Sequence, residues 1–362
     1  MRQWCGILIL VSFLLTFSKA HTQSLFKQPS IGLQGFYGSF LTRVPKAQYL
    51  RDSYSYSGEL SIQRQTDGRY AWQRANGLPQ VGLALFYGNT GSKQYLGNMA
   101  GVFPFITWKL FKTPAFQSSI RAGSGLGWIQ KPYDKITNHK NVLIGTHGNA
   151  YVNFLWQNEV QLFSNVHINA GFSFSHFSNG SSTLPNLGLN ISAFSVGLRY
   201  GPSEKTTVPK RGIDTFTKKI VFAGFTSVGI KQAPWIESKR YITNVLLAEW
   251  SRQFRSYGKY SGGAVLFYDR ALEVNPNGLL DQKLKGTKLQ AGVFVGYEHL
   301  LGKLSIPLQL GVYVYNPAIY TTLFQQIGLR YRITKNWSAQ LAMKTHSGKA
   351  DFIHLGFGYH FR

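Results

Sequence analysis

The feature that most constrains the fold is a two-residue alternation of apolar and polar side chains, which recurs in short segments along the chain. In residues 166–178 the even positions hold Val, Ile, Ala, Phe, Phe, His and Ser, and the odd positions hold mostly small or polar residues. Successive side chains of a strand point to opposite faces, so such a segment has one apolar face. About sixteen strands are predicted in this way, near residues 30–42, 55–65, 80–89, 96–111, 117–130, 147–162, 165–178, 188–201, 217–230, 241–255, 258–270, 287–301, 303–315, 322–333, 336–345 and 350–361.

The composition indicates which kind of β-protein this is. Aromatic residues make up 15% of the chain, glycines number 38, and charged residues make up only 15%, which is low for a soluble protein. After the first twenty residues, no segment approaches the roughly 20 apolar residues that a membrane helix needs. Alternating strands with aromatic residues and glycine are typical of outer-membrane barrels. The sequence therefore predicts an all-β fold, an antiparallel transmembrane β-barrel of about 14–16 strands.

The N-terminus has the pattern of an export signal. Arg2 precedes an apolar core at residues 7–17, and Ser18-Lys19-Ala20 form a small-x-small cleavage site. The single cysteine, Cys5, would leave with this signal, so the mature chain has no thiol and no disulfide. We therefore expect the protein in the outer membrane of a Gram-negative bacterium.

The predicted organisation divides the chain at a polar segment rich in lysine, arginine and proline. It consists of a signal peptide at 1–20, strands carrying the candidate site at 21–201, a polar link at 202–215 and further strands at 216–362. We expect the later strands to close the same barrel as the earlier ones. Two smaller barrels joined by the link are the alternative, and the oligomeric state is left open.

The charge balance predicts an anionic partner. Lys and Arg number 39 against 14 Asp and Glu, a formal net charge of +25. For an exported barrel the natural partner is the phosphorylated head group of lipid A or a related glycolipid. Nucleic acid is not expected, because the basic residues are scattered singly and no RNA-binding aromatic signature is present. The histidines lack metal-ligand spacing, so neither a metal nor an organic cofactor is implied.

One segment combines the residue types of a serine hydrolase. His176 and Ser178 fall on the same, apolar face of their predicted strand, which in a barrel faces lipid. Asn190 falls on the corresponding face of the next strand, where it could orient the imidazole. Asn179, Gly180 and Ser181 follow the serine, where backbone and side-chain amides could hold an oxyanion. On spacing alone, a polar girdle at the strand end is the competing interpretation.

The same segment resembles a known family. His176-Phe-Ser-Asn, followed by Pro185-Asn-Leu-Gly188-Leu-Asn190, is similar to the active-site segment of PagL-type lipid A 3-O-deacylases, grouped with acyloxyacyl hydrolases. The resemblance extends upstream through the glycines of 123–127 and the Lys-Pro-Tyr-Asp of 131–134. It implies an outer-membrane barrel with its active site on the lipid-facing wall, and a serine esterase that removes an ester-linked acyl chain from lipid A. His176 would be the base and Ser178 the nucleophile.

The chain departs from the family pattern at one position. The family has glutamate fourteen residues after the histidine, where this chain has Asn190. An asparagine accepts a hydrogen bond from the imidazole but does not stabilise the imidazolium with a full charge. Glu159, on a neighbouring predicted strand, is a candidate substitute.

Two other functions stay open. One is a non-catalytic barrel, a pore or structural protein that keeps a degenerate hydrolase segment, with polar residues toward its lumen at Gln290, Glu298, Arg330 and Arg332. The other is lipase or phospholipase activity, because the same site could cleave a glycerolipid ester.

Overall fold

The structure is a computed structural model built almost entirely of antiparallel strands. It describes residues 29–42, 45–202, 216, 218–233, 239–274, 286, 288–317 and 321–361. The predicted signal at 1–20, with Cys5, and nearly all of the 202–215 link lie outside these residues. The first eight strands are β1 (Ser30–Leu41), β2 (Ser55–Gln65), β3 (Gln80–Asn89), β4 (Asn98–Lys112), β5 (Phe116–Ile129), β6 (Gly148–Phe163), β7 (Val166–Ser178) and β8 (Leu189–Tyr200).

The second half of the chain contributes eight more strands of similar length. They are β9 (Ile220–Gln232), β10 (Arg240–Arg255), β11 (Gly258–Asp269), β12 (Leu289–Leu301), β13 (Leu304–Tyr315), β14 (Leu323–Arg332), β15 (Trp337–His346) and β16 (Lys349–Phe361). Within the described ranges, three short helical turns lie between strands: η1 (Pro45–Leu50), α3 (Ala71–Ala75) and η2 (Arg270–Glu273). Among the described residues no helix is long and apolar enough to cross a membrane.

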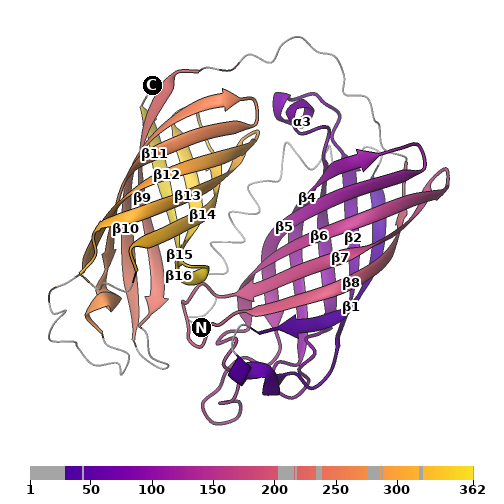
Figure 1. Cartoon of the computed structure of the whole chain (residues 1–362), viewed down its shortest axis with the longest axis horizontal. Coiled ribbons are helices and arrows are strands. Elements are labelled where there is room, and N and C mark those ends of the chain that lie inside the picture. Colours follow the sequence, from indigo (N-terminus) through magenta and orange to yellow (C-terminus); the bar gives the residue numbers. More distant parts are fainter. Residues whose placement is uncertain are drawn as a thin grey trace. The chain divides into compact units, whose positions relative to one another are not determined.

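The strands close into two barrels (Figure 1). β1 pairs with β8, from Ile31 opposite Tyr200 to Leu41 opposite Asn190, and so completes an eight-stranded ring. β9 likewise pairs with both β10 and β16. The expectation that residues 216–362 continue the first barrel is therefore wrong, and the alternative of two smaller barrels is confirmed. Alternation fixes which face of a strand is apolar, but it does not say which strand pairs with the first one.

Grouping the chain by its contacts also gives two compact units. One unit contains the strands β1–β8 and the other contains the strands β9–β16.

The first barrel is filled by side chains. A barrel of eight strands has an interior just wide enough for side chains to fill it. Arg121 donates two hydrogen bonds to Glu59, at 2.6 and 2.8 Å, and a third to Asn153 at 2.9 Å. The Arg121 guanidinium also lies over the ring of Phe103. This ring belongs to a cluster of buried aromatic side chains that includes Phe86, Tyr151 and Phe177. The outward positions of the same strands are apolar and exposed, for example Leu33, Leu85 and Val196.

The second barrel repeats this design with different residues. Arg330 bridges two buried carboxylates, with its Nη1 atom 2.9 Å from Glu249 and 3.1 Å from Glu298. The guanidinium also stacks on the ring of Phe225. Gln290, Glu298 and Arg330 are buried inside this barrel, as predicted, while Arg332 is only half-buried. Here too, packed side chains occupy the interior.

Removing the shared cation should destabilise one barrel only. Arg330→Met removes the cation that Glu249 and Glu298 share and leaves Lys259, 3.5 Å from Glu298, as the remaining cation of the cluster, so we expect the second barrel to lose about 3–5 kcal/mol of unfolding free energy. Hydrogen exchange mass spectrometry during urea unfolding checks this, with the exposed Arg252→Met as the matched control. Because β9–β16 pair only among themselves, peptides of β1–β8 should keep their transition, and an equal shift in both sets would contradict independent closure.

Candidate active site

The candidate site lies on two adjacent strands of the first barrel. β7 and β8 pair in antiparallel register, which places His176 directly opposite Asn190. On both strands the even-numbered residues face outward: Phe172 and Phe194 are exposed, whereas Ser173 and Ser195 are buried. His176, Ser178 and Asn190 are even-numbered members of this outer face. The predicted shared face is confirmed, and it is the outer, apolar one.

The imidazole and the amide are in hydrogen-bond contact. His176 Nδ1 lies 2.7 Å from Asn190 Oδ1. A carbonyl oxygen only accepts, so Nδ1 carries the proton and donates it. Nε2 is then left with its lone pair, which is the form of histidine that can take a proton from a hydroxyl group. The prediction that Asn190 reaches the imidazole is confirmed.

Ser178 ends β7, two residues beyond the histidine. It lies opposite Ala150 of β6 and is 6% exposed. Residues two apart on a strand have Cα atoms about 7 Å from each other and side chains on one face, a separation that a histidine side chain can bridge. The candidate nucleophile and the candidate base are therefore neighbours on one strand rather than on separate loops.

The inward-facing neighbours of these residues anchor the site. Phe177 and Leu189 are fully buried and belong to one apolar cluster that continues from the barrel interior into the loop between β5 and β6. That loop contributes the buried Leu143, whose carbonyl accepts a hydrogen bond from the amide of Gly188 at 3.1 Å. Along a strand, each outward side chain follows and precedes an inward one. Because the inward side chains are packed in the core, they fix the position of the outer-wall residues between them.

The loop between β5 and β6 is held together by its own side chains. Asn141 is fully buried; it accepts hydrogen bonds from the amides of Leu143 and Ile144 and donates one to a carbonyl at Lys131. The backbone N–H groups of Thr137 and Ile136 hold the pKa of Asp134 below its ordinary value. This loop includes the Lys-Pro-Tyr-Asp segment noted in the sequence.

The predicted oxyanion residues begin the loop Asn179–Leu187. The amide N–H of Asn179 donates to Asn186 Oδ1 at 3.1 Å, and its side-chain amide donates to the Thr183 carbonyl at 2.8 Å. Gly180 and Ser181 both have a φ of 62°, which turns the chain sharply after the serine. The two Asn179 donors are thus engaged within the loop, and the oxyanion role of Asn179, Gly180 and Ser181 stays a prediction.

Glu159 does not substitute for the missing acid. Its side chain is buried inside the barrel, where it binds Arg199 at 2.6 Å and lies 3.3 Å from His167. On β6 it is opposite Asn169, whereas Val152 is opposite His176. Seven residues of strand separate the two positions, about 23 Å. The sequence left the orientation of Glu159 open, and its odd position in an alternating segment is the signal that could have shown an inward side chain.

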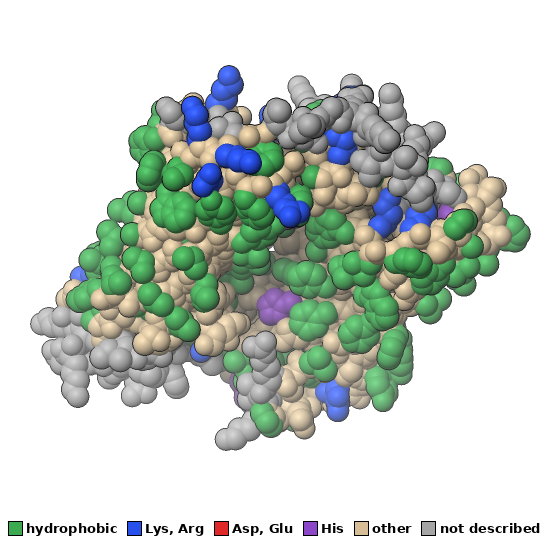
Figure 2. All heavy atoms as spheres, turned by 45° about the horizontal axis from the view of Figure 1, so that its top comes forward, with side chains coloured by type: hydrophobic (Ala, Val, Ile, Leu, Met, Phe, Trp, Pro, Cys, Tyr) green, Lys and Arg blue, Asp and Glu red, His purple; other side chains and the backbone are tan. Residues whose placement is uncertain are grey.

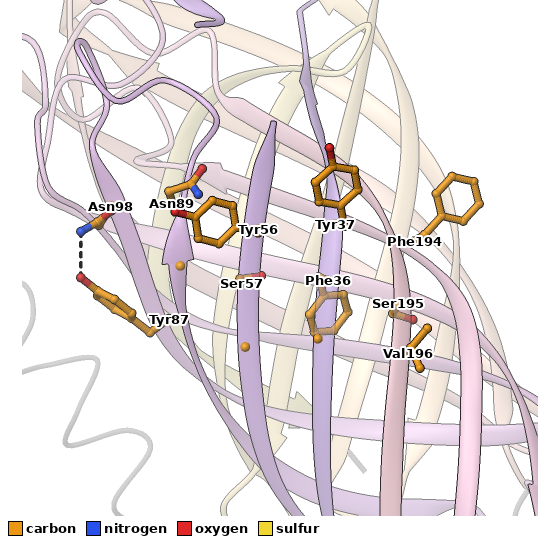
Figure 3. Close-up of a pocket in the computed structure, with 13 residues that line it drawn as sticks. Phe36, Tyr37, Tyr56, Ser57, Tyr87, Asn89, Asn98, Phe194, Ser195 and Val196 are labelled. Atoms are coloured by element: carbon orange, nitrogen blue, oxygen red, sulfur yellow. Dashed lines mark hydrogen bonds between the residues drawn. The ribbon is translucent and has the colours of Figure 1, made fainter. Parts of the chain in front are cut away.

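A shallow groove of about 650 Å³ crosses the outer wall of the same barrel (Figure 3). Gly35 and Gly58 lie opposite each other in its floor, flanked by Val196 and Tyr87 in the same cross-strand row. The aromatic side chains of Tyr37, Tyr56 and Phe194 border it. The sequence alone did not indicate this groove, because glycines on neighbouring strands are seen to be adjacent only once the strand register is known.

Fold and site together define a β-barrel that carries a histidine, a serine and an asparagine on its outer wall. The sequence profile described as lipid A 3-O-deacylase (PagL) matches residues 56–199, which include the site. The profile described as acyloxyacyl hydrolase, C-terminal domain, matches residues 218–362, which form the second barrel. The chain belongs to the PagL lipid A 3-O-deacylase and acyloxyacyl hydrolase family.

Solved structures of outer-membrane barrels also match, at low identity. Neisserial surface protein A shares 8% identity over 48% of this chain and 96% of its own, with a TM-score of 0.34. A triple mutant of Rhodopseudomonas blastica porin shares 8% identity over 92% of this chain and 99% of its own, with a TM-score of 0.17. The outer membrane protein Omp33 of Acinetobacter baumannii shares 8% identity over 92% of this chain and 98% of its own, with a TM-score of 0.19. No curated protein matches the chain.

Gly188 supports the imidazole from the loop side and gives a test of the site's geometry. Its φ is 79°, and a Cβ atom there would lie 2.7 Å from His176 Cε1. We expect Gly188→Ala to displace the imidazole from Asn190, seen as a changed ¹⁵N shift of Nδ1 in NMR spectra of selectively labelled protein. Gly77→Ala is the matched control, because Gly77 has a φ of 70° but open space around it. An unchanged His176 signal in Gly188→Ala would contradict the described contact.

Proposed function

We propose that the protein is an outer-membrane serine esterase that removes an ester-linked acyl chain from lipid A. The observation that carries the proposal is the 2.7 Å hydrogen bond from His176 to Asn190 on the outer wall, within the segment that matches the deacylase profile. A site on the outer wall suits a substrate that is itself a membrane lipid. The most direct substrate class is a glycolipid ester with a hydroxyacyl chain.

In the first half of the reaction, the Ser178 hydroxyl attacks the ester carbonyl. Its proton passes to Nε2 of His176, while the carbonyl oxygen takes up the negative charge. The same proton then goes to the sugar oxygen as the carbon–oxygen bond to the sugar breaks. The products are a free sugar hydroxyl and an acyl group on Ser178. Asn190 keeps the proton of Nδ1 in place throughout, which holds the ring in its working tautomer.

In the second half, water replaces the sugar. His176 takes a proton from the water as it attacks the acyl carbonyl, and returns this proton to the Ser178 oxygen as the fatty acid leaves. No further redox or metal step is needed to balance the reaction. Asn190 stabilises the positive charge of the transient imidazolium less well than a carboxylate would.

The place of the site along the strand agrees with this substrate. Ser178 lies where β7 enters a long loop, the side that faces the outer leaflet in barrels of this kind. From Asn190, β8 carries outward apolar side chains to Phe194 and Val196 at the groove, about 13–20 Å away. One acyl chain spans about half of the ~30 Å hydrocarbon core, so a chain whose ester lies at Ser178 would extend along this wall to the groove.

The pore alternative has less support. An ion path needs an open lumen, and large side chains fill the interior of both barrels. Arg121 and the aromatic rings occupy the first, and Arg330 with its carboxylates occupies the second. The presence of Asn190 where the family has glutamate is the observation that favours a non-catalytic family member, and the Asn190→Glu variant tests it.

The central test is mass spectrometry of lipid A after incubation with the full-length protein folded in detergent. Wild type should release one 3-hydroxyacyl chain, whereas Ser178→Ala and His176→Ala should leave lipid A intact. Ser192→Ala, an outward serine two residues beyond Asn190, is the matched control and should keep activity. A glycerophospholipid in a parallel incubation distinguishes a deacylase of lipid A from a phospholipase.

An unchanged lipid A spectrum from folded wild-type protein would overturn the deacylase proposal. Heat-modifiable migration in gel electrophoresis establishes that each variant is folded. Loss of activity in Ser192→Ala to the same extent as in Ser178→Ala would also count against Ser178 as the nucleophile.

Restoring the acid should raise the rate. Asn190→Glu places a carboxylate at the imidazole, and a hydrogen bond to a charged group is stronger by about 1–1.5 kcal/mol. We expect kcat to increase about tenfold. Leu198→Glu adds the same charge on the outer face of the same strand, eight residues or about 26 Å from Asn190, and serves as control. A rate that falls or stays equal in Asn190→Glu would mean that Asn190 does not act as the orienting residue.

A further inference from the structure

The short-turn end of the second barrel carries a cluster of cations that the proposed reaction does not use. Six exposed lysines and arginines lie there, together called the cationic rim: Lys218, Lys219, Arg252, Arg255, Lys303 and Lys335. Strand pairing brings them to one end. Arg252 is opposite Ile220, the residue after Lys219, and its Nε donates to the Lys218 carbonyl at 2.9 Å. Lys303 is joined to the β14 end, because its carbonyl accepts from the Arg332 amide at 2.8 Å.

No carboxylate neutralises the cationic rim among the described residues of this barrel. Glu249 and Glu298 are buried inside the barrel, where both pair with Arg330 and Glu298 also pairs with Lys259. At the opposite, long-loop end the carboxylates Asp269 and Asp351 pair with Lys231, and exposed lysines and arginines lie there as well. Figure 2 turns the top of Figure 1, where the C-terminus is marked, toward the viewer. Lysine and arginine side chains gather there, and no aspartate or glutamate is visible.

A belt of exposed aromatic side chains adjoins the cationic rim. It consists of Phe222, Trp250, Phe254, Tyr260, Trp337, Tyr359 and Phe361. Several of these rings contact each other, including Trp250 with Tyr260 and Trp337 with Tyr359. In barrels of this class aromatic girdles mark the two membrane interfaces, and the short turns face the periplasm. Cations just outside such a girdle lie at the level of lipid head groups.

We propose that the cationic rim binds the phosphates of anionic glycerophospholipids in the leaflet on the short-turn side. This inference rests on the membrane placement in the proposed function, but not on catalysis. The chemistry is charge pairing of lysine and arginine with phosphate in a shallow, aromatic-bordered interface. The second barrel would thereby select the lipids around its short-turn end.

The test compares phosphatidylglycerol with phosphatidylcholine around the full-length protein. Spin-labelled forms of each are added to phosphatidylcholine vesicles that contain the protein, and electron spin resonance gives their relative association constants. Each lysine or arginine near the membrane surface is expected to raise the association constant of the anionic lipid, relative to the zwitterionic one, about fivefold. Wild type should therefore prefer phosphatidylglycerol by at least this factor. The preference should shrink in 1 M salt, where the screening length is about 3 Å.

Two matched variants identify the surface. In the first, Lys218, Lys219, Arg252 and Lys335 are each changed to Gln, and the preference should fall nearly to one. In the second, the exposed long-loop cations Lys239, Arg240, Arg270 and Lys349 are each changed to Gln, which removes the same charge, and the preference should persist. Equal association of the two lipids in wild type, or equal loss in both variants, would overturn the inference.

This experiment separates the inference from the proposed reaction. Ser178→Ala should show the wild-type lipid preference, because the substitution leaves the second barrel untouched. An inactive protein with intact phosphatidylglycerol preference would count against the esterase alone. A protein that does not insert into vesicles would overturn both proposals.

Discussion

The structure depends on the closing of eight strands into a ring. A strand at the edge of an open sheet leaves a row of unpaired backbone N–H and C=O groups, which an apolar surrounding does not tolerate. The pairing of β1 with β8, and of β9 with β16, removes these edges. Eight strands also set the width of each interior, so large side chains fill it and polar side chains within it must satisfy each other. Arg121 with Glu59, and Arg330 with its two carboxylates, meet this requirement.

The interior is full, and the candidate catalytic side chains lie on the outer wall. His176, Ser178 and Asn190 project outward, while the residues between and beside them, Phe177 and Leu189, are locked into the core. The strand backbone thus transmits the rigidity of the core to a site that is open to the surrounding lipid. This arrangement explains how a site can be precise without being enclosed.

Acidic and basic side chains of the second barrel occupy different places. The described carboxylates of the second barrel are buried inside or lie at its long-loop end, and they are matched by lysine and arginine. The excess of cations remains outside, much of it at the short turns beyond the aromatic belt. The net charge of +25 is therefore not spread over the protein as a uniform field.

The sequence by itself determined the strands, their faces and the candidate site. The period of two is a local property, so it located the sixteen strands and placed His176, Ser178 and Asn190 on one outward face. Only the tertiary structure decided that β8 returns to β1 to make two barrels, that Glu159 is committed to Arg199, and that Gly35 and Gly58 meet in one groove. These facts depend on pairing between strands far apart in the chain, and alternation along a single strand carries no information about its partners.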